Sequence, residues 1–193
     1  FYTVRPTGDR PLDLDGIFAE LAEAKVNLVH NSDFEDWPEH AANYAEINSD
    51  PRAREYLDRA AAHGLQVLMG FDRMMVVRGN TAGLQTRARA LTDHPALFGW
   101  YLIDEPNLQG ATPQATLAAA EAVREVDRKP LTSALCDAET MPDYEPSLDV
   151  LITDVYPVSV NSLFSLVPHI ERALVASGGA KPVWAAIQVH NDD

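Results

Sequence analysis

The tripeptide Asp104-Glu105-Pro106 combines the residue types best suited to proton-transfer chemistry in this chain. It follows directly on an apolar run, so we expect both carboxyl groups at the end of a buried strand. Two adjacent carboxyl groups in a partly dry setting tend to raise the pKa of one of them. We therefore expect Glu105 to act as a general acid and base, with Asp104 as its modulator and Pro106 fixing the turn. The alternative is that Asp104 caps a turn and Glu105 is a solvated loop residue.

Strand-like apolar runs alternate with segments of helical periodicity along almost the whole chain. Strands are expected over 26–30, 65–71, 98–103, 130–135, 149–155 and 182–189, and helices over 13–25, 50–63, 84–91, 112–127 and 163–174. Residues 136–148 leave room for a loop or one helical turn. Such alternation indicates parallel strands joined by crossover helices.

Two architectures have this order of elements, an open doubly wound sheet and a closed barrel. An open sheet usually carries its chemistry at a glycine-rich first turn, and this sequence has no such turn. Polar residues instead follow one expected strand after another, as they do at the active face of a (β/α)₈ barrel. The sequence therefore predicts an α/β fold of the (β/α)₈ TIM-barrel type.

The barrel is expected to be incomplete in this chain. If residues 1–4 are the end of strand 1, the run over 182–189 is strand 7, and strand 8 with its flanking helices is absent. A whole barrel takes roughly 250 residues, whereas this chain has 193. We expect residues 1–193 to form one partial TIM-barrel domain.

The segment 94–107, with the sequence HPALFGWYLIDEPN, resembles strand 4 of glycoside-hydrolase barrels of clan A and of related uncharacterised glycosidase-like families. In those barrels an apolar strand followed by Asn-Glu-Pro or Asp-Glu-Pro places the general acid/base at the barrel mouth. The segments 154–157 (DVYP) and 181–184 (KPVW) support the resemblance. It covers nearly the whole chain in layout, but only residues 104–106 are specific in sequence. The resemblance implies a catalytic domain that hydrolyses O-glycosidic bonds of a poly- or oligosaccharide, with Glu105 as the acid/base.

Hydrolysis of a glycosidic bond also needs a second carboxylate, as nucleophile or as base. The resemblance implies a Glu at the end of strand 7, but Gln188 occupies that position, and an amide is no nucleophile. Three alternatives stay open. Asp154 is the second carboxylate, Asp104 and Glu105 act together with an acetamido group of the substrate, or the barrel binds sugar without cleaving it. We prefer Asp154, whose alternative role is to hold the turn at Tyr156.

Other residues at strand ends are expected to hydrogen-bond sugar hydroxyl groups, or alternatively to support the site from loops. They are His30, Asp72, Tyr156, Gln188 and His190. Trp37 lies in the long segment 32–49 after an expected strand and is predicted to stack on a sugar ring. Trp100 and Trp184 lie within strands, which favours core packing.

The sequence contains few motifs typical of metal or cofactor sites. Metal-dependent barrel hydrolases commonly open with His-x-His on strand 1, which residues 1–4 lack. His30, Asp154 and His190 could converge on a metal, but no close-spaced pair of ligands supports them. No glycine-rich phosphate loop, serine nucleophile elbow or Cys–His pairing stands out. We therefore expect neither cofactor nor metal, and keep a metal-dependent hydrolase as the weaker alternative.

Composition narrows the range of partners. The chain is 46% hydrophobic, its mean hydropathy is -0.18, and no apolar run approaches the roughly 20 residues of a membrane span. A net charge of -14, from 29 acidic and 15 basic residues, disfavours nucleic acid. The single Cys136 excludes an intrachain disulfide. We expect a carbohydrate partner without nucleic acid or membrane contacts. Oligomeric state and compartment are not specified, although the resemblance slightly favours an extracellular or periplasmic location.

Overall fold

The computed structural model describes residues 13–30, 51–156 and 162–187 of the chain. Within these ranges the strands form one parallel sheet whose order follows the sequence. The strands are β1 (Leu28–His30), β2 (Gln66–Gly70), β3 (Leu97–Tyr101), β4 (Leu131–Leu135), β5 (Val150–Asp154) and β6 (Val183–Ala186). Each strand therefore pairs with the strand that precedes it in the chain, as barrel construction requires.

Helical segments connect successive strands. The α-helices are α1 (Leu14–Glu23), α3 (Pro51–Ala62), α4 (Arg73–Val77), α5 (Thr81–Leu91), α6 (Pro113–Arg124), α7 (Met141–Tyr144) and α8 (Leu166–Ala176), and the 3₁₀ turns are η2 (Glu145–Ser147) and η3 (Leu163–Ser165). Local capping signals decide where several of them begin. Thr112 accepts a hydrogen bond from the backbone N–H of Ala115, and Pro113 fills the first turn of α6, where its missing N–H costs nothing.

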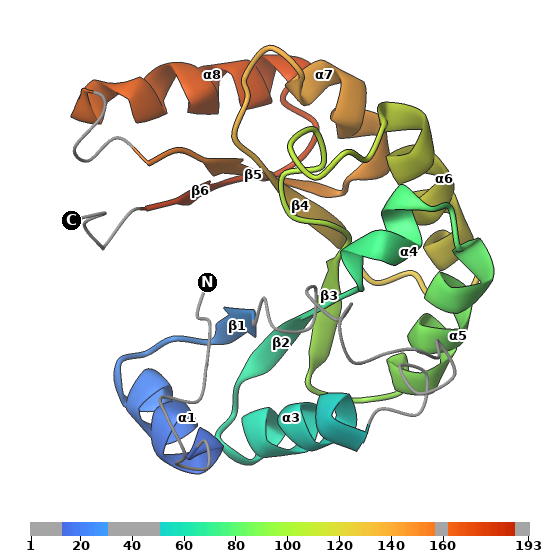
Figure 1. The fold of residues 1–193 in the computed structure, drawn as a ribbon. Helices are drawn as coiled ribbons and strands as arrows, with labels where there is room; N and C mark the ends of the chain where they lie inside the picture. Colours follow the sequence, from blue (N-terminus) through green and yellow to red (C-terminus); the bar gives the residue numbers. More distant parts are fainter. Residues whose placement is uncertain (1–12, 31–50, 157–161, 188–193) are drawn as a thin grey trace.

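The sheet curls into an open ring with the helices along its outer side (Figure 1). Its curvature is strong enough that the two edge strands line one cavity of about 210 Å³. Val29 and His30 line it from β1, and Trp184 and Ala185 from β6. The described residues thus form consecutive β/α units of an incomplete (β/α)₈ barrel, which confirms the predicted fold class. The expected strand end at residues 1–4 lies outside the described residues.

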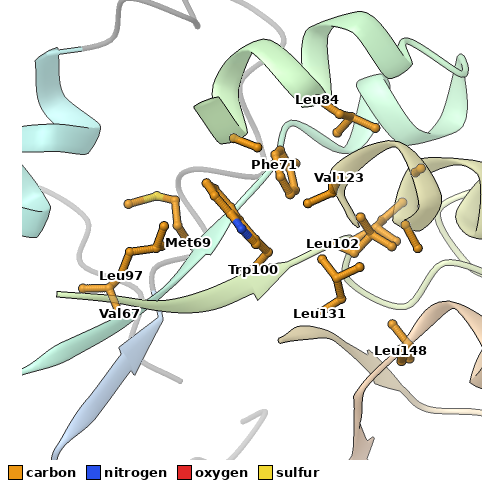
Figure 2. Close-up of a cluster of buried hydrophobic side chains, with 14 of the residues drawn as sticks. Val67, Met69, Phe71, Leu84, Leu97, Trp100, Leu102, Val123, Leu131 and Leu148 are labelled. Atoms are coloured by element: carbon orange, nitrogen blue, oxygen red, sulfur yellow. The ribbon is translucent and has the colours of Figure 1, made fainter. Parts of the chain in front are cut away.

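The main core lies between the sheet and the outer helices. Figure 2 shows Trp100 of β3 and Phe71 projecting toward Leu84 of α5 and Val123 of α6. The rings of Phe71 and Trp100 stack with centroids 4.8 Å apart. A smaller cluster, formed by Tyr101, Ala134 and Ile152 with Trp184 and Ala186, lies on the other face of the strands. Because side chains alternate along a strand, this second cluster faces the inside of the ring.

Several elements differ from the sequence expectations. Helix α4 directly follows β2 and was not anticipated, since its five residues are too few to display a period. Strand β3 ends at Tyr101, two residues before the expected end. On α8 the apolar side chains of Val167 and Leu174, which lie seven residues apart, are 51% and 45% exposed, and Ala173 is the buried residue.

Two further expectations concern tryptophan packing and membranes. Trp100 is fully buried in the main core, as predicted, and Trp184 is only partly buried within the inner cluster. None of the helices in the described ranges is long and apolar enough to span a bilayer.

Candidate active site

Hydrogen bonds fix the backbone between the end of β3 and the carboxylates of Asp104 and Glu105. Leu102 donates its N–H to the carbonyl oxygen of Thr132 at 2.8 Å, and the N–H of Ile103 donates to Ser133 Oγ at 3.3 Å. Trp100 contributes from the outer side, because its Nε1–H donates to Asp127 Oδ2 at 2.9 Å. These bonds tie the end of β3 to β4 and to the segment that follows α6, so the residues after β3 leave the sheet at a defined point.

Asp104 is held from inside the ring by Tyr101. The Tyr101 hydroxyl donates to Asp104 Oδ1 at 2.6 Å and accepts the N–H of Ala134 at 3.1 Å. The Tyr101 ring packs against the His30 ring with centroids 4.1 Å apart. Asp104 is therefore connected to β1 and β4 through one buried side chain.

Glu105 has an unusual backbone conformation. Its φ of 36° lies in the left-handed region, which a non-glycine residue rarely adopts. The turn is closed by N–H groups of Leu108 and Gln109, which donate to the Glu105 carbonyl oxygen at 2.9 and 3.0 Å. Strained conformations of this kind concentrate at functional sites. The strained turn therefore indicates that Glu105 has a functional role rather than a packing role.

Burial raises the pKa of the Glu105 carboxyl above its ordinary value, and the negative charge of Asp104 adds to this effect. A hydrogen bond with Cys136 partly opposes it by stabilising the carboxylate. Burial and the neighbouring Glu105 in turn raise the pKa of Cys136 to about 12. The thiol is thus protonated at neutral pH and available as a donor to Glu105.

Asp154 is the last residue of β5 and only 6% exposed. Its Oδ2 accepts the Tyr156 hydroxyl at 3.0 Å, whereas its Oδ1 is buried without a hydrogen-bond partner in the part of the chain that the structure describes. Burial raises the pKa of Asp154 to about 6, and the charges of Asp104 and Glu105 contribute, while the Tyr156 hydrogen bond opposes. The ends of β3 and β5 therefore bring three carboxyl groups close enough to affect one another.

His30 and Tyr156 belong to the surroundings of this group. His30, at the end of β1, is buried, and its Nδ1 lies 3.0 Å from the Leu68 carbonyl oxygen. Tyr156 is 45% exposed, and burial of its hydroxyl together with the Asp154 charge raises its pKa. Tyr156 thus contacts Asp154 directly, whereas His30 is connected to the carboxyl groups through Tyr101.

Asp72 lies in a different network. Its carboxylate caps α4 by accepting the N–H of Met74 at 2.8 Å. Burial raises its pKa, and the charges of Arg73 and Arg87 oppose the increase. Neither Glu105 nor Asp154 contributes to that shift. The predicted sugar contacts of Trp37, Gln188 and His190 lie outside the described residues.

Two residues of this site, Tyr101 and Cys136, were not predicted from the sequence. Cys136 directly follows β4, as Asp104 and Glu105 come soon after β3, so the rule that strand ends carry the site would have found it. Tyr101 lies within a strand that reads as uniformly apolar, and only the alternation of side chains places it on the inner face.

A metal site is not apparent in the described ranges, which hold no cluster of three histidine, cysteine or acidic side chains arranged to bind an ion. The arrangement is instead suited to proton transfer. A carboxyl group with a raised pKa serves as an acid near neutral pH, and a second one nearby serves as base or nucleophile.

Comparison with solved structures identifies the fold. An exo-β-1,4-mannosidase from Opitutaceae bacterium strain TAV5 matches with a TM-score of 0.59 and 17% identity over 90% of this chain and 47% of its own. A structure described as a glycoside hydrolase matches with a TM-score of 0.63 and 13% identity over 94% and 74%. A mandelate racemase/muconate lactonizing enzyme-like protein from Rubrobacter xylanophilus matches with a TM-score of 0.53 and 12% identity over 94% and 44%.

These matches show a shared barrel fold, and several of the matching structures are glycoside hydrolases. The chain spans less than half the length of the Opitutaceae mannosidase and of the racemase-like protein. No protein-family model matches the chain, and no curated protein has a similar sequence. At these identities the likeness reports architecture, so the chemistry has to be argued from the site.

Proposed function

We propose that this barrel is a glycoside hydrolase that cleaves O-glycosidic bonds of a poly- or oligosaccharide. Glu105 protonates the leaving oxygen, and Asp104 modulates Glu105 with its charge. Asp154 is the second carboxylate, which acts as nucleophile or activates water.

The observation that carries this proposal is that the carboxyl groups after β3 lie close enough to Asp154 at the end of β5 for their charges to raise its pKa. Glu105 and Asp154 come from different strands, both have a raised pKa, and the charge of Asp104 contributes to each. Acid/base hydrolysis of a glycoside needs one protonated and one ionised carboxyl on either side of the bond. The glycoside hydrolases among the structural matches support the same class of reaction.

The unpartnered oxygen of Asp154 suggests how the substrate would favour this division of roles. Burial without a full set of donors keeps Asp154 close to its titration point, at about 6. A sugar hydroxyl or an attacking water that donates to the unpartnered Oδ1 would supply the missing hydrogen bond and favour the ionised form. Substrate binding would thereby prepare Asp154 for its role as nucleophile or base.

The test compares Glu105→Gln with the wild type on aryl glycosides of neutral hexoses with good and poor leaving groups. The variant keeps the size of the side chain but cannot donate a proton, so we expect kcat/KM to fall by roughly 10²–10⁴ with poor leaving groups. The loss should be smaller with good leaving groups, which need less protonation. Glu121→Gln, on an exposed position of α6, is the matched control and should leave the rates unchanged.

The second candidate is a barrel that binds carbohydrate without cleaving it, and Gln188 at the expected nucleophile position favours it. In that case the wild type binds oligosaccharide, as measured by calorimetry, but turns over none of the aryl glycosides. Near-normal hydrolysis by Glu105→Gln would instead remove Glu105 from its assigned role.

A further inference from the structure

Tyr101 joins three strands of the barrel at the inner face of β3. Its side chain is 1% exposed, although it carries a polar hydroxyl. The hydroxyl lies between the N–H of Ala134 on β4 and Oδ1 of Asp104, and the ring packs against His30 of β1. A buried tyrosine placed in this way links the barrel scaffold directly to one of the carboxylates.

The two hydrogen bonds give the hydroxyl a direction. Because the Tyr101 oxygen accepts the N–H of Ala134 at 3.1 Å, its own proton is turned toward Asp104, where the oxygen–oxygen distance is 2.6 Å. Short bonds of this kind are typical of a hydroxyl that donates to a carboxylate. The Ala134 N–H belongs to the β4 backbone, so the donor cannot rotate away without breaking a second bond.

We propose that Tyr101 is a positioning residue that holds the Asp104 carboxylate against Glu105 and Asp154 and thereby sets the protonation of the carboxyl site. The placement of Tyr101 is independent of what the site cleaves. Its consequence for catalysis rests on the proposed glycosidase function.

The groups that face the site come from four strands or the segments that follow them. They are His30 on β1, Asp104 and Glu105 after β3, Cys136 after β4, and Asp154 and Tyr156 on and after β5. Within the described ranges, no lysine or arginine is among the groups that shift the pKa of Glu105 or of Asp154. Among the described residues, no lysine or arginine charge offsets the carboxylates, so the site depends on where these carboxylates are held.

Loss of the Tyr101 hydroxyl removes the donor that fixes Asp104. The carboxylate can then turn away from its neighbours, which reduces the negative charge opposite Asp154. Since that charge raises the pKa of Asp154 and of Glu105, both pKa values should fall.

The test is a ¹³C NMR titration of side-chain carboxyl groups in the full chain, with the Asp154 signal assigned by its loss in Asp154→Asn. We expect Asp154 to titrate at about 6 in the wild type. In Tyr101→Phe the midpoint should be lower by about half a pH unit or more. In an Asp104→Asn background, Tyr101→Phe should change the midpoint no further, because the charge that it positions is already gone.

Tyr144→Phe is the matched control. Tyr144 is also buried, and its hydroxyl donates to the Ala111 carbonyl oxygen at 2.8 Å, so this variant loses a comparable hydrogen bond away from the carboxyl group. It should leave the Asp154 midpoint unchanged. A folded Tyr101→Phe variant whose Asp154 titrates as in the wild type would overturn the proposal.

If Tyr101→Phe does not fold, the wild type gives the answer. The Tyr101 hydroxyl proton should then be protected from exchange, shifted to low field, and sensitive to the titration of Asp154. A hydroxyl proton in fast exchange with water would contradict the proposal. Neither NMR measurement requires turnover, so a lack of glycosidase activity would refute the proposed function and leave the role of Tyr101 standing.

Discussion

Replacement of Asp154 by Asn should stabilise the protein above pH 6 and destabilise it below pH 4. Asp154 has a pKa of about 6 in the folded chain, against an ordinary value of 3.8 for an aspartate. Between these values the folded state holds a proton that the unfolded state has released, so the free energy of unfolding decreases as pH rises. A difference of about 2 pH units corresponds to about 3 kcal/mol, the cost of ionising the buried carboxyl. The Asp154 side chain is 6% exposed, so solvent screening reduces this ionisation cost only slightly.

Asn cannot ionise and avoids this cost, but its NH₂ group would lie where Oδ1 has no partner among the described residues. An unpaired buried amide costs about 1–2 kcal/mol at every pH. The net gain of Asp154→Asn should therefore be about 1–2 kcal/mol at pH 8, and the variant should be about 1–2 kcal/mol less stable than the wild type at pH 3.5. The two stability curves should cross between these limits.

Urea unfolding followed by tryptophan fluorescence, at intervals from pH 3.5 to pH 8, measures this difference. Asp127→Asn is the control, since both oxygens of the buried Asp127 carboxylate already accept N–H donors, from Trp100 and Lys129. It should lose stability without the crossing of curves. A difference between Asp154→Asn and the wild type that is the same at all pH values would refute the reasoning.

Two further predictions concern packing and substrate charge. Gly99→Ala should destabilise the chain by about 1–3 kcal/mol in thermal or urea unfolding, because a Cβ there would lie 2.6 Å from the Pro130 carbonyl oxygen. An unchanged unfolding midpoint would contradict the close approach of β3 and β4. No lysine or arginine is among the groups that shift the pKa of Glu105 or Asp154 in the described ranges. Aryl glycosides of neutral hexoses should therefore be hydrolysed at least about tenfold faster than the corresponding uronides. A higher kcat/KM for uronides would contradict this charge argument.

The fold was predictable because its signals are local and repeated. Proline and a capping residue mark the beginning of α6, and a glycine closes the turn after α3. Apolar runs mark the strands, and their regular alternation with helices leaves few topologies. The short helix α4 escaped prediction because five residues carry no measurable period.

The apolar side chains of α8 show a second limit. Spacing along the sequence predicts which side chains share a helix face, but not whether another element covers that face. Val167 and Leu174 do share a helix, and in the described ranges both are about half exposed.

The site was predictable as far as strand ends reveal it. Asp104, Glu105 and Asp154 follow or end strands, and parallel strands bring such residues to one edge of the sheet. Contacts that depend on side-chain direction and strand register were not predictable in this way. The hydrogen bond from Tyr101 to Asp104 needs Tyr101 on the inner face of β3, and the bond between Cys136 and Glu105 needs the pairing of β3 with β4.

The most direct test of the account is a crystal structure of the Glu105→Gln variant with a bound oligosaccharide of neutral sugars. We predict a glycosidic oxygen within about 2.6–3.2 Å of the residue 105 side chain, with the Asp154 carboxylate facing the anomeric carbon or its attacking water. A saccharide bound elsewhere, with residues 105 and 154 both out of reach of the glycosidic bond, would contradict the claim that these carboxyl groups form a hydrolytic site.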